Sequence, residues 1–168
     1  MLYEAEMDNE VVTPLNLKYP KKMSYHTWHV YGYGICTDDI VRNTTEDRVK
    51  NLLSLAPVFN EKLQKHFSEC GVETPELDDY KEYDEMCLNG ITSILFHVIE
   101  EAEDMPLCAV RDYEDCEYIV FEPMYPWVEP DSVKDLTEEK LEQIFKKYVG
   151  ILMDEAIEIG FQEIENGG

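Results

Sequence analysis

The sequence predicts an α+β fold, with a small, mainly antiparallel sheet and helices packed on one face of that sheet. Its 168 residues are 44% hydrophobic, which is enough for one self-sufficient core. Strand-like and helix-like apolar patterns follow one another in the order β-α-α-α-β-β-α-β. This order lacks the regular strand-helix alternation of a parallel sheet. We therefore expect a single domain over residues 26–168, preceded by an extended arm at residues 1–25.

Prolines, aromatic residues and glycines predict the arm and the first strand. Pro14 and Pro20 exclude a helix within the arm. Residues 26–35 are rich in Trp, Val and Tyr, which favour a strand. Gly32 and Gly34 leave one face of that strand without side chains, so we expect another element, a helix, to pack closely against it.

Three helices are expected next. Thr44 or Thr45 is suited to cap a short helix, because a threonine hydroxyl accepts a hydrogen bond from a free backbone N–H. Pro57 suits the first turn of a second helix. Apolar residues at helical spacing then predict a long helix over residues 83–104, with a weak point at Asn89-Gly90.

The second half of the chain predicts a hairpin, a helix and a strand. Residues 107–111 and 116–122 are strand-like and flank a turn at residues 112–115. Thr137 is suited to cap the last helix. Alternation of apolar and polar residues over 157–161 predicts the final strand.

Charge is the unusual property of the sequence. There are 14 Lys and Arg against 37 Asp and Glu, a net charge of −23. Residues 71–168 hold 27 of the acids and six of the bases. Since phosphate groups are bound by Lys and Arg, this balance argues against direct binding to DNA, RNA or an anionic membrane. It favours a basic protein as the partner.

Five cysteines without a CxxC pair, and an N-terminus without a secretory pattern, predict a cytoplasmic protein. We expect the cysteines to be reduced and buried.

The motifs of common enzymes are missing. There is no Walker or GxGxxG pattern, and no cofactor, metal or catalytic residue is predicted. His26 and His29, with Cys36 nearby, are three residues apart on a strand and would point to opposite faces, so we read them as ordinary strand histidines. The numerous carboxylates leave a metal-dependent hydrolase as a lesser alternative.

The carboxylates themselves are the candidate site. Helical acids three or four residues apart are about 5–6 Å from each other, a spacing comparable to that of phosphates along a DNA strand. The predicted partner-binding residues lie on the long helix and in the hairpin turn: Glu82, Glu85, Glu100, Glu103, Asp104, Asp112, Glu114 and Asp115.

Four details occur together in this chain: Tyr31-Gly32-Tyr33-Gly34, Tyr125-Pro126-Trp127, the helix at residues 141–152, and the ending Glu165-Asn166-Gly167-Gly168. Together they resemble small acidic proteins of bacterial phages and conjugative elements, most of which are uncharacterised. In size and charge the chain is also similar to anti-restriction and anti-CRISPR proteins that mimic DNA.

We therefore expect a non-enzymatic inhibitor that binds the basic nucleic-acid surface of a defence nuclease. The alternative is an acidic accessory protein of a mobile element without mimicry, which would bind its partner through Phe96, Tyr125 and Trp127.

Overall fold

The computed structural model describes residues 27–83, 85–122, 127 and 131–167. The chain divides into two compact units, one formed by His29–Glu165 and the other by Met1–Trp28 with Asn166–Gly168. The side-chain contacts discussed below lie within His29–Glu165. The arm predicted at residues 1–25 lies outside the described residues.

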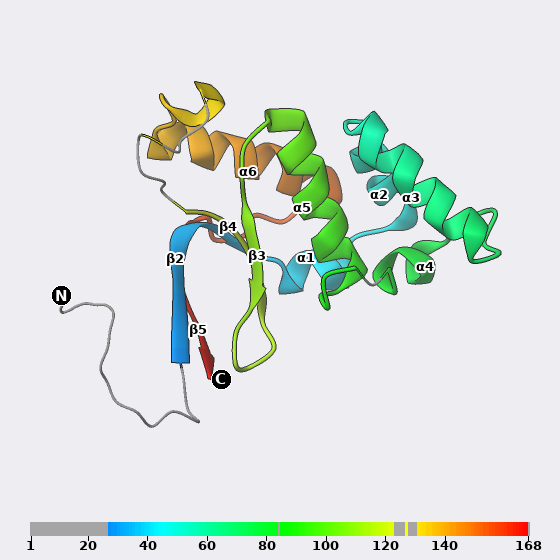
Figure 1. Ribbon diagram of the computed structural model, residues 1–168, viewed down its shortest axis with the longest axis horizontal. Helices are drawn as coiled ribbons and strands as arrows, with labels where there is room; N and C mark the ends of the chain where they lie inside the picture. The colour runs from blue at the N-terminus through cyan, green and yellow to red at the C-terminus, as the bar shows by residue number, and fades with distance from the viewer. Residues whose placement is uncertain (1–26, 84, 123–126, 128–130, 168) are drawn as a thin grey trace. The chain divides into compact units, whose positions relative to one another are not determined.

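The chain has an α+β fold, as the sequence predicts (Figure 1). Within the described residues, four strands form an antiparallel sheet in the order β3-β4-β2-β5. The elements in chain order are β2 (Thr27–Cys36), α1 (Asp38–Asn43), α2 (Glu46–Leu53), α3 (Pro57–Glu69), α4 (Leu77–Lys81), α5 (Gly90–Glu103), β3 (Cys108–Arg111), β4 (Glu117–Phe121), the 3-10 turn η1 (Asp131–Val133), α6 (Glu138–Leu152) and β5 (Gly160–Gly167).

One face of the sheet carries the main core. Tyr33, Ile35, Ile119 and Phe121 alternate along β2 and β4 and pack in one cluster with apolar residues of the helices. The opposite face carries a smaller cluster made of strand residues only, centred on Val120. The helices therefore cover one face, as predicted.

Helix α5 lies at the centre of the core. Residues 90–99 are buried all round the helix except at His97, which is half-buried. This is why α5 contacts α2, α3 and α4 as well as β3 and β4. No helix of the described part of the chain is long and apolar enough to cross a membrane.

Local sequence patterns placed three helix starts correctly. The Thr45 hydroxyl accepts the backbone N–H of Arg48 at the start of α2. Thr137 does the same for Lys140 at the start of α6. Pro57 begins α3, as predicted.

The long helix predicted over residues 83–104 begins seven residues too early. The helix begins at Gly90, where the Asn89 side chain accepts the backbone N–H of Ile91. Residues 82, 83 and 85–89 lie outside any helix, between α5 and the short helix α4, which the sequence did not predict. A Cβ on Gly90 would lie 1.8 Å from the Tyr80 carbonyl oxygen, so the start of the helix is set by a close approach to α4.

Three further expectations are corrected. A strand, not a helix, packs against the glycines of β2: a Cβ on Gly34 would lie 2.0 Å from the Ile119 carbonyl oxygen of β4. The final strand was predicted over residues 157–161, but it spans Gly160–Gly167. Ile157 and Ile159 lie in the connection before it and pack against the core. The five free cysteines are not buried: Cys36, Cys108 and Cys116 are half-buried, and Cys70 and Cys87 are exposed. The helix α1 was also not predicted.

Candidate functional site

The predicted acidic residues occupy three places. Glu82 and Glu85 lie at the end of α4 and between α4 and α5, not on the long helix. Glu100, Glu103 and Asp104 lie at the C-terminal end of α5. The remaining three, Asp112, Glu114 and Asp115, form the turn between β3 and β4. Since α5 leads into β3, these last two groups lie at opposite ends of that strand (Figure 1). The predicted acids therefore do not form one continuous ridge.

Two acids at the C-terminal end of α5 form hydrogen bonds within the protein. The Glu100 carboxylate accepts the backbone N–H of Leu107 at 3.1 Å. Glu103 accepts the hydroxyl hydrogen of Tyr148 on α6 and lies 3.7 Å from Lys147 Nζ. Glu103 is among the causes that raise the pKa of Tyr148, after burial. These two carboxylates stabilise the fold, whatever else they do.

Asp104 ends α5 in the left-handed conformation, with φ of 52°, and is exposed. An aspartate tolerates this conformation better than most residues. The left-handed C-cap of α5 therefore accounts for an aspartate at position 104.

The β3–β4 turn is built around Asp112. Its Oδ1 atom accepts the backbone N–H groups of Glu114 at 2.8 Å and Cys116 at 2.9 Å. Asp115 takes a positive φ of 68°, which a short polar side chain tolerates. The Glu114 and Asp115 side chains are exposed.

The turn lies against the last strand. The backbone N–H of Tyr113 donates to the Glu165 carbonyl oxygen at 3.0 Å, which joins positions 52 residues apart in the sequence. Glu163 and Glu165 of β5 share His29: its Nδ1 atom is 3.3 Å from Glu163 and its Nε2 atom is 3.8 Å from Glu165. We call Asp112, Glu114, Asp115, Glu163 and Glu165 the turn–strand patch.

Sequence reasoning missed Glu163 and Glu165. Their proximity to the turn depends on a tertiary contact between β5 and the hairpin, and nothing in the local pattern of either segment reports it. The alternation of residues along β5 was the available indication, and it was assigned a few residues too early.

Neighbouring groups respond to the negative charge of the turn. The pKa of Cys116 is raised to about 11, first by burial and then by the carboxylates of Asp38 and Asp112. The pKa of Tyr118 is also raised, by burial and then by Asp112. The turn therefore combines exposed carboxylates with a negative local potential.

Glu85 and Glu100 come together at a second place, a pocket of about 320 Å³ between α3 and α5. Its lining residues are Val58, Phe59, Lys62, Tyr83, Glu85, His97, Glu100 and Glu101. Glu85 is 2.6 Å from His97 Nε2 and accepts the Tyr83 hydroxyl hydrogen at 3.0 Å. Burial and then Glu85 raise the pKa of Tyr83 to about 12. The Phe59 ring stacks on His97, with 4.6 Å between centroids.

This pocket offers a carboxylate–imidazole pair that can accept or pass on a proton. Its described lining holds no Ser, Thr or Cys that the pair could activate as a nucleophile. The cysteine–histidine contact on α3, between Cys70 Sγ and His66 Nε2, is 3.9 Å long and exposed.

The three contact residues predicted for the accessory-protein alternative differ in their exposure. Phe96 is only 9% exposed and belongs to the core, so it is not available to a partner. Trp127 is 79% exposed. Tyr125 lies outside the described residues.

The described residues contain no group of three or more His, Cys, Asp and Glu side chains placed to hold a metal ion. His29 faces Glu163 and Glu165, and His26 lies outside the described part.

Comparison of the chain with protein-family models, with curated proteins and with solved structures finds no match.

Proposed function

We propose that this protein is an acidic, non-enzymatic inhibitor that binds the basic nucleic-acid surface of a defence nuclease, such as a CRISPR effector or a restriction enzyme. The exposure of its carboxylates is the observation that carries the proposal. Most of the acids described between residues 71 and 165 are exposed, on helices and loops alike. Such side chains are available to replace phosphates in a basic groove.

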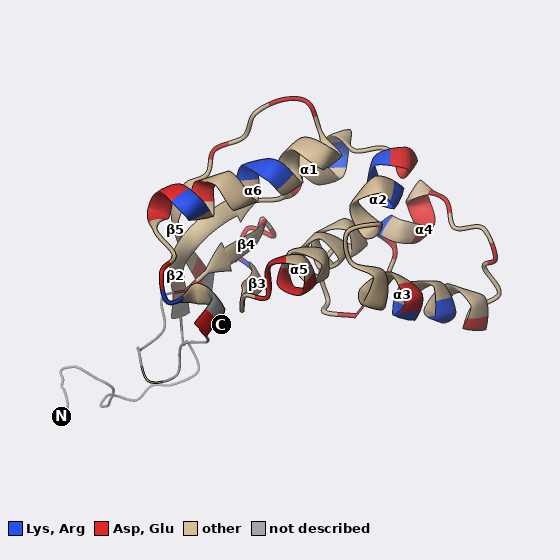
Figure 2. Ribbon diagram, turned by 90° about the horizontal axis from the view of Figure 1, so that it is seen from above, with Lys and Arg blue, Asp and Glu red and all other residues tan. Residues whose placement is uncertain are grey.

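Basic side chains neutralise only a small part of this charge. Among the described residues, Lys and Arg form the ion pairs Arg42–Asp39, Arg48–Asp154, Lys50–Glu46, Arg111–Glu117, Lys134–Asp131 and Lys147–Glu103. Figure 2 shows that basic positions lie mainly on helices, whereas acidic positions also follow the loops between them. The excess negative charge therefore faces solvent.

The turn–strand patch is the best candidate for the centre of the interface. It combines acids of two segments that are tied together by a backbone hydrogen bond, and the Asp112 carboxylate is fixed by two further hydrogen bonds. Charges carried on a fixed backbone lose less conformational entropy on association than charges on a mobile segment do. His29 is the basic group that the structure places beside Glu163 and Glu165.

An accessory protein of a mobile element is the second candidate. The observation that favours it is an exposed aromatic pair: Tyr31 and Phe161 are 58% and 53% exposed, and their rings stack with 5.6 Å between centroids. Exposed aromatic side chains are common anchors of protein interfaces. Association through this pair alone would depend little on salt.

The proposal is tested with a panel of purified CRISPR effectors and restriction enzymes. Each nuclease is mixed with fluorescently labelled target DNA, and the protein is added while anisotropy and cleavage are measured. We expect one nuclease to release its DNA and lose cleavage in parallel. A nuclease that binds the protein while retaining its DNA would favour the accessory role, and a panel without binding would contradict the proposal.

A further inference from the structure

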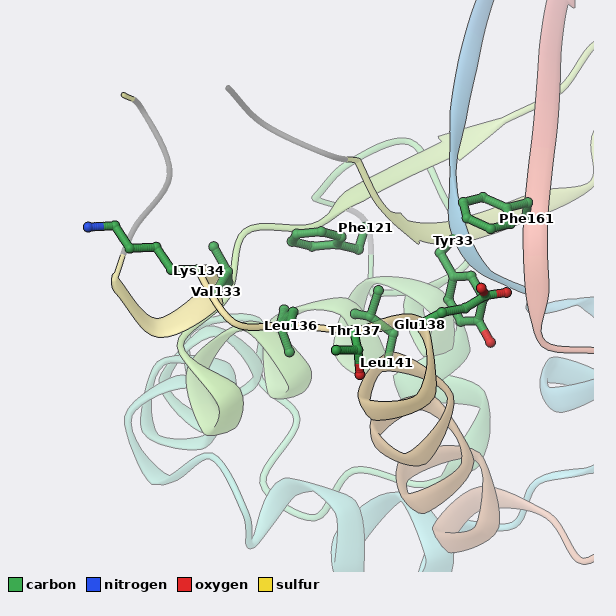
Figure 3. A pocket seen from close by; sticks show the side chains of 9 residues that line it. All are labelled: Tyr33, Phe121, Val133, Lys134, Leu136, Thr137, Glu138, Leu141 and Phe161. Carbon is green, nitrogen blue, oxygen red and sulfur yellow. The ribbon is translucent and has the colours of Figure 1, made fainter. Parts of the chain in front are cut away.

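A second cavity, of about 210 Å³, lies between the sheet and the start of α6 (Figure 3). Tyr33, Phe121 and Phe161 line it from three strands, and Leu136 and Leu141 line it from the helical side. Pockets that bind drug-sized molecules measure roughly 300–1,000 Å³. This volume therefore suits one side chain of a partner better than a free ligand.

One end of the cavity is polar and negative. Tyr33 is only 4% exposed, and its ring forms part of the cavity wall. Glu138, in the first turn of α6, extends toward Tyr33 and Phe161 (Figure 3). Burial, followed by the charges of Glu142 and Glu138, raises the pKa of the Tyr33 hydroxyl. A phenol oxygen and a nearby carboxylate can both accept hydrogen bonds from a cationic donor.

Lys134 lies at the other end of the cavity and does not repel a cation bound near Glu138. Lys134 also lines the cavity, but its amino group points away from Tyr33 and Glu138 (Figure 3). Its Nζ atom is 2.8 Å from Asp131, which neutralises its charge locally.

Aromatic rings complete the cavity. The edge of one ring faces the other in the Tyr33–Phe161 pair, with 5.2 Å between centroids, and the exposed Phe161 ring also stacks on Tyr31. A planar guanidinium group stacks on such rings, and its alkyl stem packs on apolar walls. Arginine fits this combination better than lysine because it joins a flat face to several fixed donors.

We propose that this cavity receives an arginine side chain of the basic partner, with its guanidinium donating to Glu138 and to the Tyr33 oxygen and packing on Phe161. The partner is the one proposed above, so this assignment rests on the proposed function for the source of the arginine. The arginine pocket, defined as Tyr33, Phe121, Glu138, Leu141 and Phe161, is separate from the turn–strand patch.

The arginine pocket is tested on the isolated protein by NMR, with N-acetyl-arginine methylamide as the probe. We expect saturable shifts of the backbone amide signals of Tyr33, Phe121 and Phe161. N-acetyl-leucine methylamide at the same concentration and ionic strength should leave them in place. Glu138→Gln should weaken the arginine probe about tenfold, the loss expected for one charge-assisted hydrogen bond.

Glu139→Gln is the matched control. Glu139 is the next residue of α6, is exposed like Glu138 and does not line the cavity, so this variant should bind the probe as the unmodified protein does. Equal shifts with the leucine probe, or equal weakening by both substitutions, would overturn the arginine assignment. These outcomes are independent of the nuclease panel, so failure of the pocket and failure of the proposed function are distinguishable.

Discussion

Arg111 and Glu117 face each other on β3 and β4, and 2.6 Å separates the guanidinium Nη2 atom from the carboxylate. Glu117 is buried and also accepts the Thr92 hydroxyl hydrogen at 2.8 Å and the Asn89 backbone N–H at 3.0 Å. One carboxylate thus ties the hairpin to the start of α5. Glu117 belongs to the acid-rich part of the sequence, yet its role is structural.

Replacing Glu117 by alanine is therefore expected to destabilise the fold. The variant removes the acceptor of a buried hydroxyl and of a backbone N–H, and Arg111 loses this ion pair. We expect the free energy of unfolding to fall by about 3 kcal/mol. Urea denaturation measures this change. Glu122→Ala, at an exposed acid just after β4, is the control and should change it by less than about 0.5 kcal/mol.

Glu101 supplies the missing cap of α3. Ala56 at the N-cap has no side-chain acceptor, and the Glu101 carboxylate accepts the backbone N–H groups of Val58 at 3.0 Å and Phe59 at 2.8 Å. We expect Glu101→Ala to cost about 1 kcal/mol, as loss of a helix cap does. Thermal unfolding should show a melting temperature lower by about 2–4 °C. No change relative to Glu61→Ala, an exposed acid of α3, would contradict the capping role.

The five cysteines should differ in reactivity toward iodoacetamide at pH 8. Cys70 and Cys87 are exposed, whereas Cys116 is half-buried with its pKa raised to about 11. The thiolate is the reactive form, so Cys116 should be modified much more slowly than Cys70 and Cys87. Mass spectrometry of peptides over a time course measures this order. Modification of Cys116 at the same rate would contradict it.

How much the sequence predicts depends on whether the determining contacts are local. Thr45 and Thr137 cap their helices through hydrogen bonds three residues away, so both helix starts were predictable. The true start of α5 depends on Gly90 meeting the backbone of Tyr80, a contact that no local pattern contains. The apolar pattern continued upstream of Gly90 as far as Tyr83, and it extended the predicted helix too far.

The same limit applies to the site. The acids of the β3–β4 turn were predicted because they are consecutive in the sequence. Their neighbours Glu163 and Glu165 come from β5, and Glu138 meets Tyr33 across more than a hundred residues. Composition predicts that the surface is acidic, but only tertiary structure decides which acids are available and which, like Glu103, are held by other residues.

Alkaline pH should destabilise the protein partly through Tyr83. Its pKa is about 12 in the folded protein, above the ordinary value of 10. The folded state therefore favours the neutral phenol, and this contribution is complete below pH 10 and is lost as the pH rises toward 12. Tyr83→Phe should make the free energy of unfolding fall less steeply between pH 9.5 and 11.5 than in the unmodified protein, by urea denaturation. Identical slopes would show that Tyr83 does not contribute.

Salt dependence of the affinity for an inhibited nuclease tests the central claim most directly. If carboxylates replace phosphates, the logarithm of the association constant should fall steeply and linearly with the logarithm of salt concentration, as it does for DNA. Reversing Glu114 and Glu163 to lysine should weaken binding at least about tenfold and flatten this slope. The control, reversal of the exposed Glu61 and Glu69 of α3, makes the same change in net charge and should do little. An affinity that is insensitive to salt, or equal in both folded variants, would contradict the account.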